Sequence, residues 1–276
     1  MQSHTTPYLE LKCGGSRKMM REVFVRFCKI VMMMCLASGL LAGCGSEDVD
    51  SDTGVEGQRI ASSMQDYVQL VLDFDQKARN GQIQGAPMGD RQVAILERAL
   101  ENGGRVSRTD YEQAWASYRQ CVVNKGYTAP PIMKVGEFYQ AQWSMASVEG
   151  QEAREEKLRE DDMACGMAEM LNVNEVYQRQ NSNPNLYRNP SEGVVDCLHR
   201  NNLVKTAYTA KDYDEENRRF DKYWNDRRMG RAPTIAETHG HFSFDYSDVD
   251  AATCLANNHE AMDVQEYKPP EWKPFG

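Results

Sequence analysis

The chain has 276 residues, of which 41% are hydrophobic and 26% charged, a composition typical of a folded protein with one or two domains. Its formal net charge of −9 argues against nucleic-acid binding through a basic surface, because neutralising phosphates requires an excess of Lys and Arg. A mean hydropathy of −0.68 and a single long apolar run exclude a protein with several membrane spans.

The N-terminal region has the pattern of an export signal. Basic residues between positions 17 and 29 precede the uncharged run 30–42, which is shorter than the roughly 20 residues that a membrane span needs. We therefore predict a signal peptide over residues 1–43. Residues 1–18 are polar and lengthen this leader unusually, so we expect the true start to be Met19 or Met20.

The apolar run ends in Leu41-Ala42-Gly43-Cys44. This tetrapeptide resembles the lipobox of bacterial lipoproteins, which implies diacylglycerol transfer to the Cys44 thiol and cleavage before Cys44. Residues 44–276 carry 26 basic and 39 acidic side chains, a net charge of −13. Anionic lipid would repel such a surface, so we expect the acyl chains to hold the protein at the outer face of the cytoplasmic membrane.

The remainder of the chain predicts a mainly α-helical protein with a few short strands. Residues 44–57 are small and acidic and predict a flexible tether after the lipidated cysteine. In the segment 58–180, apolar periodicity predicts helices over 60–78, with Phe74 facing inward, and 90–100. A capping box at Thr109 and Glu112 predicts the start of a third helix.

The third helix is expected to bury one aromatic face, made of Tyr111, Trp115, Tyr118 and Val122. The residues over 135–143 favour a strand or a hairpin arm. A single long helix is predicted over 151–180. Its charged stretch 149–162 is interpreted as a solvated helix face.

A polar segment, 181–185, separates this region from a second one over 186–276. Helices are predicted there over 192–200, 212–228 and 248–258, and the alternating residues 242–246 predict a strand. Prolines exclude a helix in the tail 267–275, whose aromatic side chains we expect to dock on the body.

Four cysteines follow the lipobox, and an even number in an exported protein predicts two disulfides. Three pairings are possible. Cys121 and Cys197 share one context, because each ends an apolar helix and stands five positions before a residue that tolerates a left-handed backbone, Gly126 or Asn202.

Cys165 and Cys254 share another context, because each follows an aspartate by four positions, Asp161 or Asp250. The same order of two contexts therefore occurs twice along the chain. We interpret this as two diverged helical repeats, each closed by its own bridge, Cys121–Cys165 and Cys197–Cys254.

The segment from Asp110-Tyr111-Glu112 through Cys121 to Gly126-Tyr127 is similar to a D-Y-x-x-A…C-x-x-x-x-G-[YF] pattern. This pattern resembles uncharacterised cysteine-paired surface lipoproteins of high-GC Gram-positive bacteria. The similarity covers about 20 residues and the lipobox. It implies the same compartment and paired cysteines, and it assigns no catalytic residue.

Two groups of residues are candidates for sites. His239 and His241 would share one face of a strand, and with the aspartates at 245, 248 and 250 they could bind a divalent metal. A polar loop with incidental histidines is the favoured interpretation. The four tryptophans could line a sugar- or lipid-binding groove, although Trp115 is expected in the core; they are Trp115, Trp143, Trp224 and Trp272.

The sequence lacks the G-x-S-x-G, H-E-x-x-H, P-loop and G-x-G-x-x-G motifs. We therefore expect a lipid-anchored envelope protein with a non-catalytic binding or accessory role, without a cofactor, in an envelope or transporter complex. One alternative is a ligand-binding lipoprotein that serves a transporter, which a deep apolar pocket would favour. A less favoured alternative is a metal-assisted hydrolase that uses His239 and His241.

Overall fold

The computed structural model describes residues 57–226 except 142, 147 and 149, together with 233–258 and 269–276. The predicted signal peptide, the lipobox with Cys44 and all but the last residue of the tether lie outside these ranges. Within them, no helix combines the length and the apolar character that crossing a bilayer requires.

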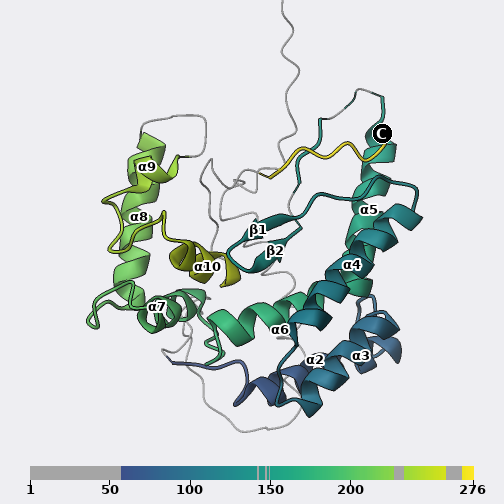
Figure 1. The fold of residues 1–276 in the computed structure, drawn as a ribbon, viewed down its shortest axis with the longest axis horizontal. Helices are drawn as coiled ribbons and strands as arrows, with labels where there is room; N and C mark the ends of the chain where they lie inside the picture. Colours follow the sequence, from purple (N-terminus) through teal and green to yellow (C-terminus); the bar gives the residue numbers. More distant parts are fainter. Residues whose placement is uncertain (1–56, 142, 147, 149, 227–232, 259–268) are drawn as a thin grey trace, which may run out of the picture.

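The described chain is mostly helical, as expected (Figure 1). The first half contains α2 (Met64–Arg79), α3 (Asp90–Glu101), α4 (Arg108–Asn124), the antiparallel hairpin of β1 (Met133–Val135) and β2 (Phe138–Gln140), α5 (Glu152–Glu169) and α6 (Leu171–Ser182). The second half contains α7 (Pro190–Arg200), α8 (Ala210–Asp226), α9 (Ile235–Thr238) and α10 (Val249–Asn257).

Two predictions for α2 and α4 are wrong. Helix α4 begins after Ser107, whose hydroxyl accepts the Asp110 N–H, so the predicted capping box at Thr109 lies inside the helix. Phe74 is 41% exposed instead of facing the core. Helix α2 instead buries Asp75, whose carboxylate accepts the backbone N–H of Met88, and this contact turns Phe74 toward solvent.

The aromatic face of α4 is buried as predicted and organises the first core. The Tyr111 ring stacks on Tyr177 at 4.0 Å and on Tyr139 at 5.5 Å between centroids. The Tyr111 hydroxyl also accepts the Tyr139 backbone N–H at 2.7 Å. The predicted strand region is therefore a short hairpin that one buried tyrosine holds against α4.

The predicted long helix over 151–180 is wrong, because the chain breaks at Met170 between α5 and α6. The fully buried side chain of Gln92 on α3 bridges this break. Its amide group donates to the carbonyls of Met167 and Ala168, and its oxygen accepts the N–H groups of Asn172 and Val173. A buried break is tolerated because these backbone groups keep hydrogen-bond partners.

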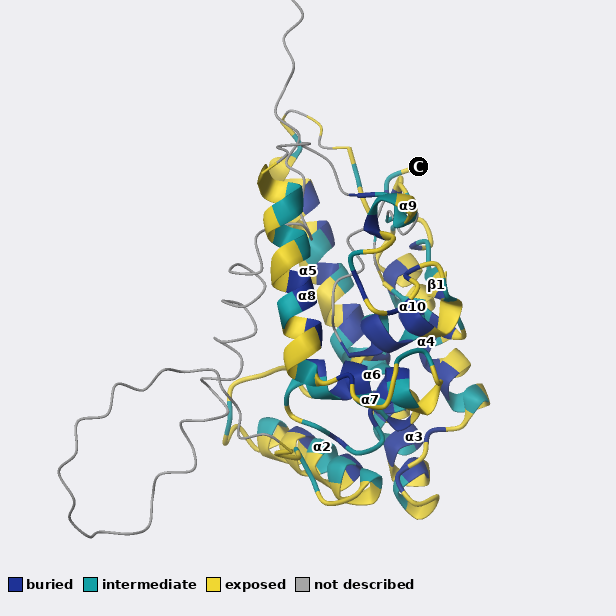
Figure 2. Ribbon diagram, turned by 90° about the vertical axis from the view of Figure 1, so that its left-hand side faces the viewer, coloured by how far each residue is buried: buried dark blue, intermediate teal, exposed yellow. Residues whose placement is uncertain are grey.

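Helix α6 is the central element. It contacts α2, α3, α4 and α5 of the first half and α7 and α10 of the second half, and it runs between the two sides in Figure 1. Glu152, Glu156 and Glu160 of α5 are exposed, as predicted for its charged face, whereas Glu155 and Asp161 are buried. Figure 2 shows exposed residues on the outer side of α2 and buried ones around α6 and α7.

The predicted strand over 242–246 is wrong, although its alternation is real. Phe242, Phe244 and Tyr246 are buried in the second core, and the residues between them are exposed. The backbone finds a side chain instead of a neighbouring strand: the N–H and hydroxyl of Ser243 both donate to the buried Glu216 carboxylate. This segment is therefore a loop that buries alternate aromatic residues.

The tail docks on the body as expected, and it does so on the first half. Trp272 is 3% exposed and contacts Trp143 with a centroid distance of 4.8 Å. Its indole N–H donates to the Thr128 hydroxyl at 2.9 Å. The described end of the chain thus packs on the first half and ends beside the start of α5, where the Arg154 guanidinium lies over the Phe275 ring (Figure 1).

Both predicted disulfides are present. Cys121 pairs with Cys165 and Cys197 with Cys254, each with a Cα–Cα distance of 5.6 Å. The first bridge joins α4 to α5, and the second joins α7 to α10. Gly126 and Asn202 have φ values of 96° and 58°, the left-handed backbone predicted after each helix.

The two bridges predict separable effects on stability. Replacing Cys121 and Cys165 together with Ser should lower the free energy of unfolding by up to about 4 kcal/mol and leave Cys197–Cys254 intact. Non-reducing peptide mapping of wild type and variant checks this. A wild-type peptide joining Cys121 to Cys197 would refute the pairing and the repeat.

The Gln92 bridge predicts a large cost for a substitution that hardly changes side-chain volume. Gln92→Leu removes four hydrogen bonds and leaves buried backbone groups unpaired, so the free energy of unfolding should fall by about 3 kcal/mol. Urea unfolding measures it. The exposed control Gln113→Leu on α4 should change stability by less than about 0.5 kcal/mol; equal effects of the two substitutions would contradict the role of the bridge.

Candidate functional site

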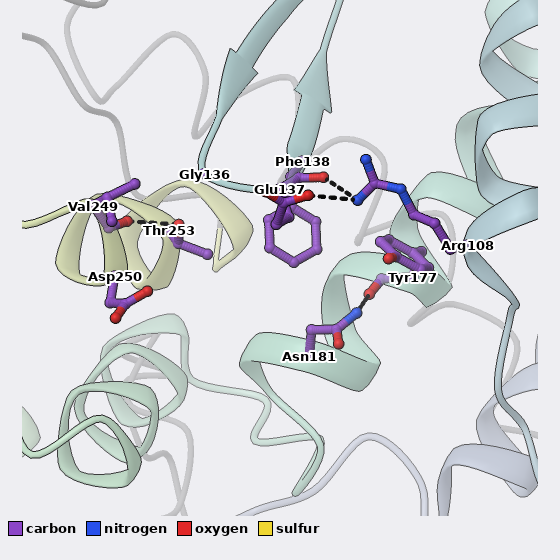
Figure 3. A pocket seen from close by; sticks show the side chains of 9 residues that line it. All are labelled: Arg108, Gly136, Glu137, Phe138, Tyr177, Asn181, Val249, Asp250 and Thr253. Atoms are coloured by element: carbon purple, nitrogen blue, oxygen red, sulfur yellow. Dashed lines mark hydrogen bonds and ion pairs between the residues drawn. The ribbon is translucent and has the colours of Figure 1, made fainter.

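A groove of about 840 Å³ lies where the two halves of the molecule meet. Its walls come from the start of α4, the turn of the hairpin, the second half of α6 and the first turns of α10 (Figure 3). The groove therefore combines residues from both sides of the polar segment 181–185. Its shape depends on how α10 packs against α6 and β1.

The positive charge in the groove is already balanced. Arg108 donates to the Glu112 carboxylate at 2.6 Å, and to the carbonyl and the carboxylate of Glu137 at 2.8 and 3.2 Å. The hydrogen bond to Glu112 raises the pKa of the guanidinium, so Arg108 stays charged. Arg108 is the one cation among the described residues that line the groove, and it is engaged by two acids.

The negative charge is not balanced in the same way. Asp250 is exposed at the start of α10, and within the described residues no hydrogen bond or ion pair reaches its carboxylate. Asn181 contributes an amide and Thr253 a hydroxyl, which donates to the Val249 carbonyl at 2.6 Å. The polar lining thus offers carboxylate and neutral oxygen atoms to a ligand.

The apolar residues that line the groove differ in how far they are buried. Phe138 is buried and Tyr177 is half-buried against the first core, where they contact each other with a centroid distance of 5.6 Å. Val249 lies at the rim of α10 and is 54% exposed. A ligand could therefore combine an aliphatic contact with a polar one, but the groove is not a deep apolar pocket.

The tip of the hairpin sits directly against α10. Gly136 has a φ of 56°, and a Cβ placed on it would lie 2.3 Å from the Thr253 hydroxyl oxygen. Only a residue without a side chain fits both the backbone and the space. Gly136 therefore sets the distance between the hairpin and α10 across the groove.

The histidine hypothesis loses its structural premise. His239 and His241 lie in a turn after α9 and not on a strand. The His241 ring contacts the rings of Tyr223 and Phe220, with centroid distances of 4.3 and 5.2 Å. Among the described residues, no group of three or more His, Cys, Asp and Glu side chains is placed to hold a metal ion.

The four tryptophans do not form one groove. Trp115 is in the first core, as expected, and Trp143 contacts Trp272 at its edge. Trp224 lies on α8 in the other half, where it stacks on Phe220. The possible aromatic groove is therefore not formed, because three of the tryptophans pack in or on the first core and Trp224 lies on α8 in the other half.

Sequence reasoning missed most of the groove. The two residues between the strands, Gly136 and Glu137, carry a usable signal, since a two-residue hairpin turn that starts with glycine is a common one. The placement of α10 against that turn depends on tertiary packing and leaves no local pattern. Apart from this turn, the groove residue that the sequence analysis singled out is Asp250, the acid that precedes Cys254 in the second repeat.

Comparison with known proteins adds no relative: no family model, no curated protein and no solved structure matches the chain.

The hairpin contact predicts that Gly136→Ala lowers the free energy of unfolding by about 1–3 kcal/mol, through backbone strain and the Thr253 clash. Thr253→Ala should recover part of this loss. Gly150 is the matched control, because it has a φ of 83° and a Cβ added to it would meet nothing within 4 Å. Urea unfolding of the double variants should show coupling of Thr253 with Gly136 only; equal rescue of both would contradict the contact.

Proposed function

We propose that the protein is a lipid-anchored, extracytoplasmic envelope protein with a non-catalytic binding role. Its anchor is the diacylglyceryl group on Cys44, and its site is the groove between the halves. The alternative of a transporter-associated lipoprotein for a small ligand receives less support, because the lining of the groove is mixed and open and not deep and apolar.

The pairing of the cysteines is the observation that supports a location outside the cytoplasm. The four cysteines that follow the lipobox form two disulfides, and none of the four is left over. Stable disulfides are typical of oxidising compartments outside the cytoplasm. This agrees with export through the predicted signal peptide over 1–43.

The start of the described chain supports a body held close to its anchor. The N–H of Ile60 donates to the Leu186 carbonyl and the N–H of Arg188 to the Gln58 carbonyl, both at 2.8 Å. The chain is thus tied to the folded body from residue 58 onward. The 14 residues from Cys44 to Gly57 are joined by 13 Cα–Cα steps and span at most about 45 Å, which limits how far the body can stand from the membrane.

A binding role agrees with the charges in the groove. Its arginine is neutralised by two acids and one exposed carboxylate has no described partner, so the site is arranged for recognition by charge and shape. We place the partner among proteins of the envelope or of a membrane complex.

The anchor is tested by metabolic labelling with palmitate. Cys44→Ala should abolish the label and leave an unprocessed precursor on a gel, because the thiol that accepts the diacylglyceryl group is gone. The matched control is Cys35→Ala, which removes a cysteine of the predicted signal peptide and should keep both labelling and processing. Persistent labelling of the Cys44 variant would overturn the proposal.

A further inference from the structure

We propose that the groove binds the ammonium group of a lysine side chain, carried on an extended segment of a partner protein, and that Asp250 is the carboxylate that receives it. The inference rests on the binding role proposed above and names the chemistry of the partner. The two disulfide-closed repeats differ in the surroundings of one shared aspartate.

The repeats place one aspartate at the same position relative to each bridge. Asp161 precedes Cys165 by four residues and Asp250 precedes Cys254 by four residues, one turn earlier on α5 and α10. Both bridges have the same Cα–Cα distance of 5.6 Å. The two aspartates are thus equivalent by position.

In the first repeat this aspartate is fully partnered. Asp161 accepts the Lys157 ammonium at 2.5 Å and the Tyr127 hydroxyl at 2.9 Å, and Lys125 lies 3.5 Å away. The hydrogen bond from Lys157 holds the pKa of Asp161 below its ordinary value. The first repeat therefore shows a carboxylate at this position taking a lysine ammonium.

In the second repeat all three partners are replaced. The positions equivalent to Lys157, Lys125 and Tyr127 hold Tyr246, Asn201 and Leu203. Tyr246 is buried in the second core, and Leu203 is apolar. Asp250 keeps its carboxylate but has lost the cations that its counterpart uses, and it now lines the groove.

The rest of the groove suits an ammonium on an aliphatic stem. Arg108 is held by Glu112 and Glu137, so an anionic ligand would find no uncommitted cation among the described lining residues. Val249 precedes Asp250 and is 54% exposed, which provides an apolar surface for a methylene chain. A lysine side chain has both parts.

The partner is a protein segment and not a free amine, because the groove is larger than one side chain. Its volume of about 840 Å³ extends from α10 to Arg108 on α4, past the tip of the hairpin (Figure 3). A short extended peptide fills such a length, and its neighbouring residues can reach Asn181 and Phe138.

The test measures peptide binding to the mature lipidated protein in phosphatidylcholine nanodiscs, which carry no net lipid charge. The probe is the acetylated and amidated peptide Val-Thr-Lys-Thr-Val with a fluorescent label, followed by anisotropy. It should bind about threefold more tightly than the same peptide with norleucine in place of lysine, as expected for an ion pair with an exposed carboxylate. Asp250→Asn should abolish this difference.

The matched control is Asp90→Asn. It removes another exposed aspartate in the first turn of a helix, so it changes the net charge of the protein by the same amount as Asp250→Asn. It should leave the preference for the lysine peptide unchanged. Equal binding of the two peptides by wild type, or equal loss in both variants, would overturn the proposal. A competition experiment with butylamine could also overturn it. If butylamine displaced the labelled peptide at the same concentration as the unlabelled peptide does, the site would bind a free amine and not a protein segment. Palmitate labelling of the same preparation reports on the anchor separately.

Discussion

The buried amide of Gln92 holds the junction on which the arrangement of the molecule depends. Helices α5 and α6 meet at Met170, where the pattern of helical backbone hydrogen bonds is interrupted. The Gln92 side chain from α3 supplies hydrogen-bond partners to backbone groups on both sides of this break. Without those partners, buried carbonyl and amide groups would cost several kcal/mol, and a continuous helix would be favoured. A continuous helix would keep the direction of α5 and lead the chain away from α7 and α10 (Figure 1). The break instead directs α6 across the molecule, where it contacts helices of both halves.

The position of the groove follows from the direction of α6. Its second half supplies Tyr177 and Asn181 to the groove, and its end fixes the second half of the chain. The Asn257 amide of α10 donates to the Ser182 hydroxyl at 2.7 Å, and Arg200 of α7 donates to the Ser182 carbonyl at 2.6 Å. These contacts are side-chain hydrogen bonds, which require one geometry more strictly than apolar packing does. The two cores can therefore remain separate while the groove between them keeps a defined shape.

The sequence predicts well what depends on local pattern. Apolar periodicity predicts the buried face of α4, and residue type predicts the left-handed backbone of Gly126 and Asn202. The repeated order of the two kinds of sequence surroundings of the cysteines predicts both disulfides. Sequence-based prediction fails where a side chain from a distant part of the chain takes the hydrogen bonds that a neighbouring backbone would otherwise make. Gln92 splits one predicted helix, and Glu216 takes the place of a strand neighbour at Ser243. Gly136 matters only because Thr253 lies against it, and nothing near either residue indicates the other. The groove is built from such contacts, so local reasoning could not find it.

The two repeats show why a site could arise in one of them and not in the other. Asp161 is 10% exposed, and a buried carboxylate without a partner costs several kcal/mol, so loss of Lys157 or Tyr127 would be costly there. Asp250 is exposed, where water solvates the charge and an ion pair contributes about 0.2–1 kcal/mol. The second repeat could therefore lose its lysines at little cost in stability. Burial thus ties the first aspartate to a structural role, whereas exposure beside the groove leaves the second free to interact with another molecule.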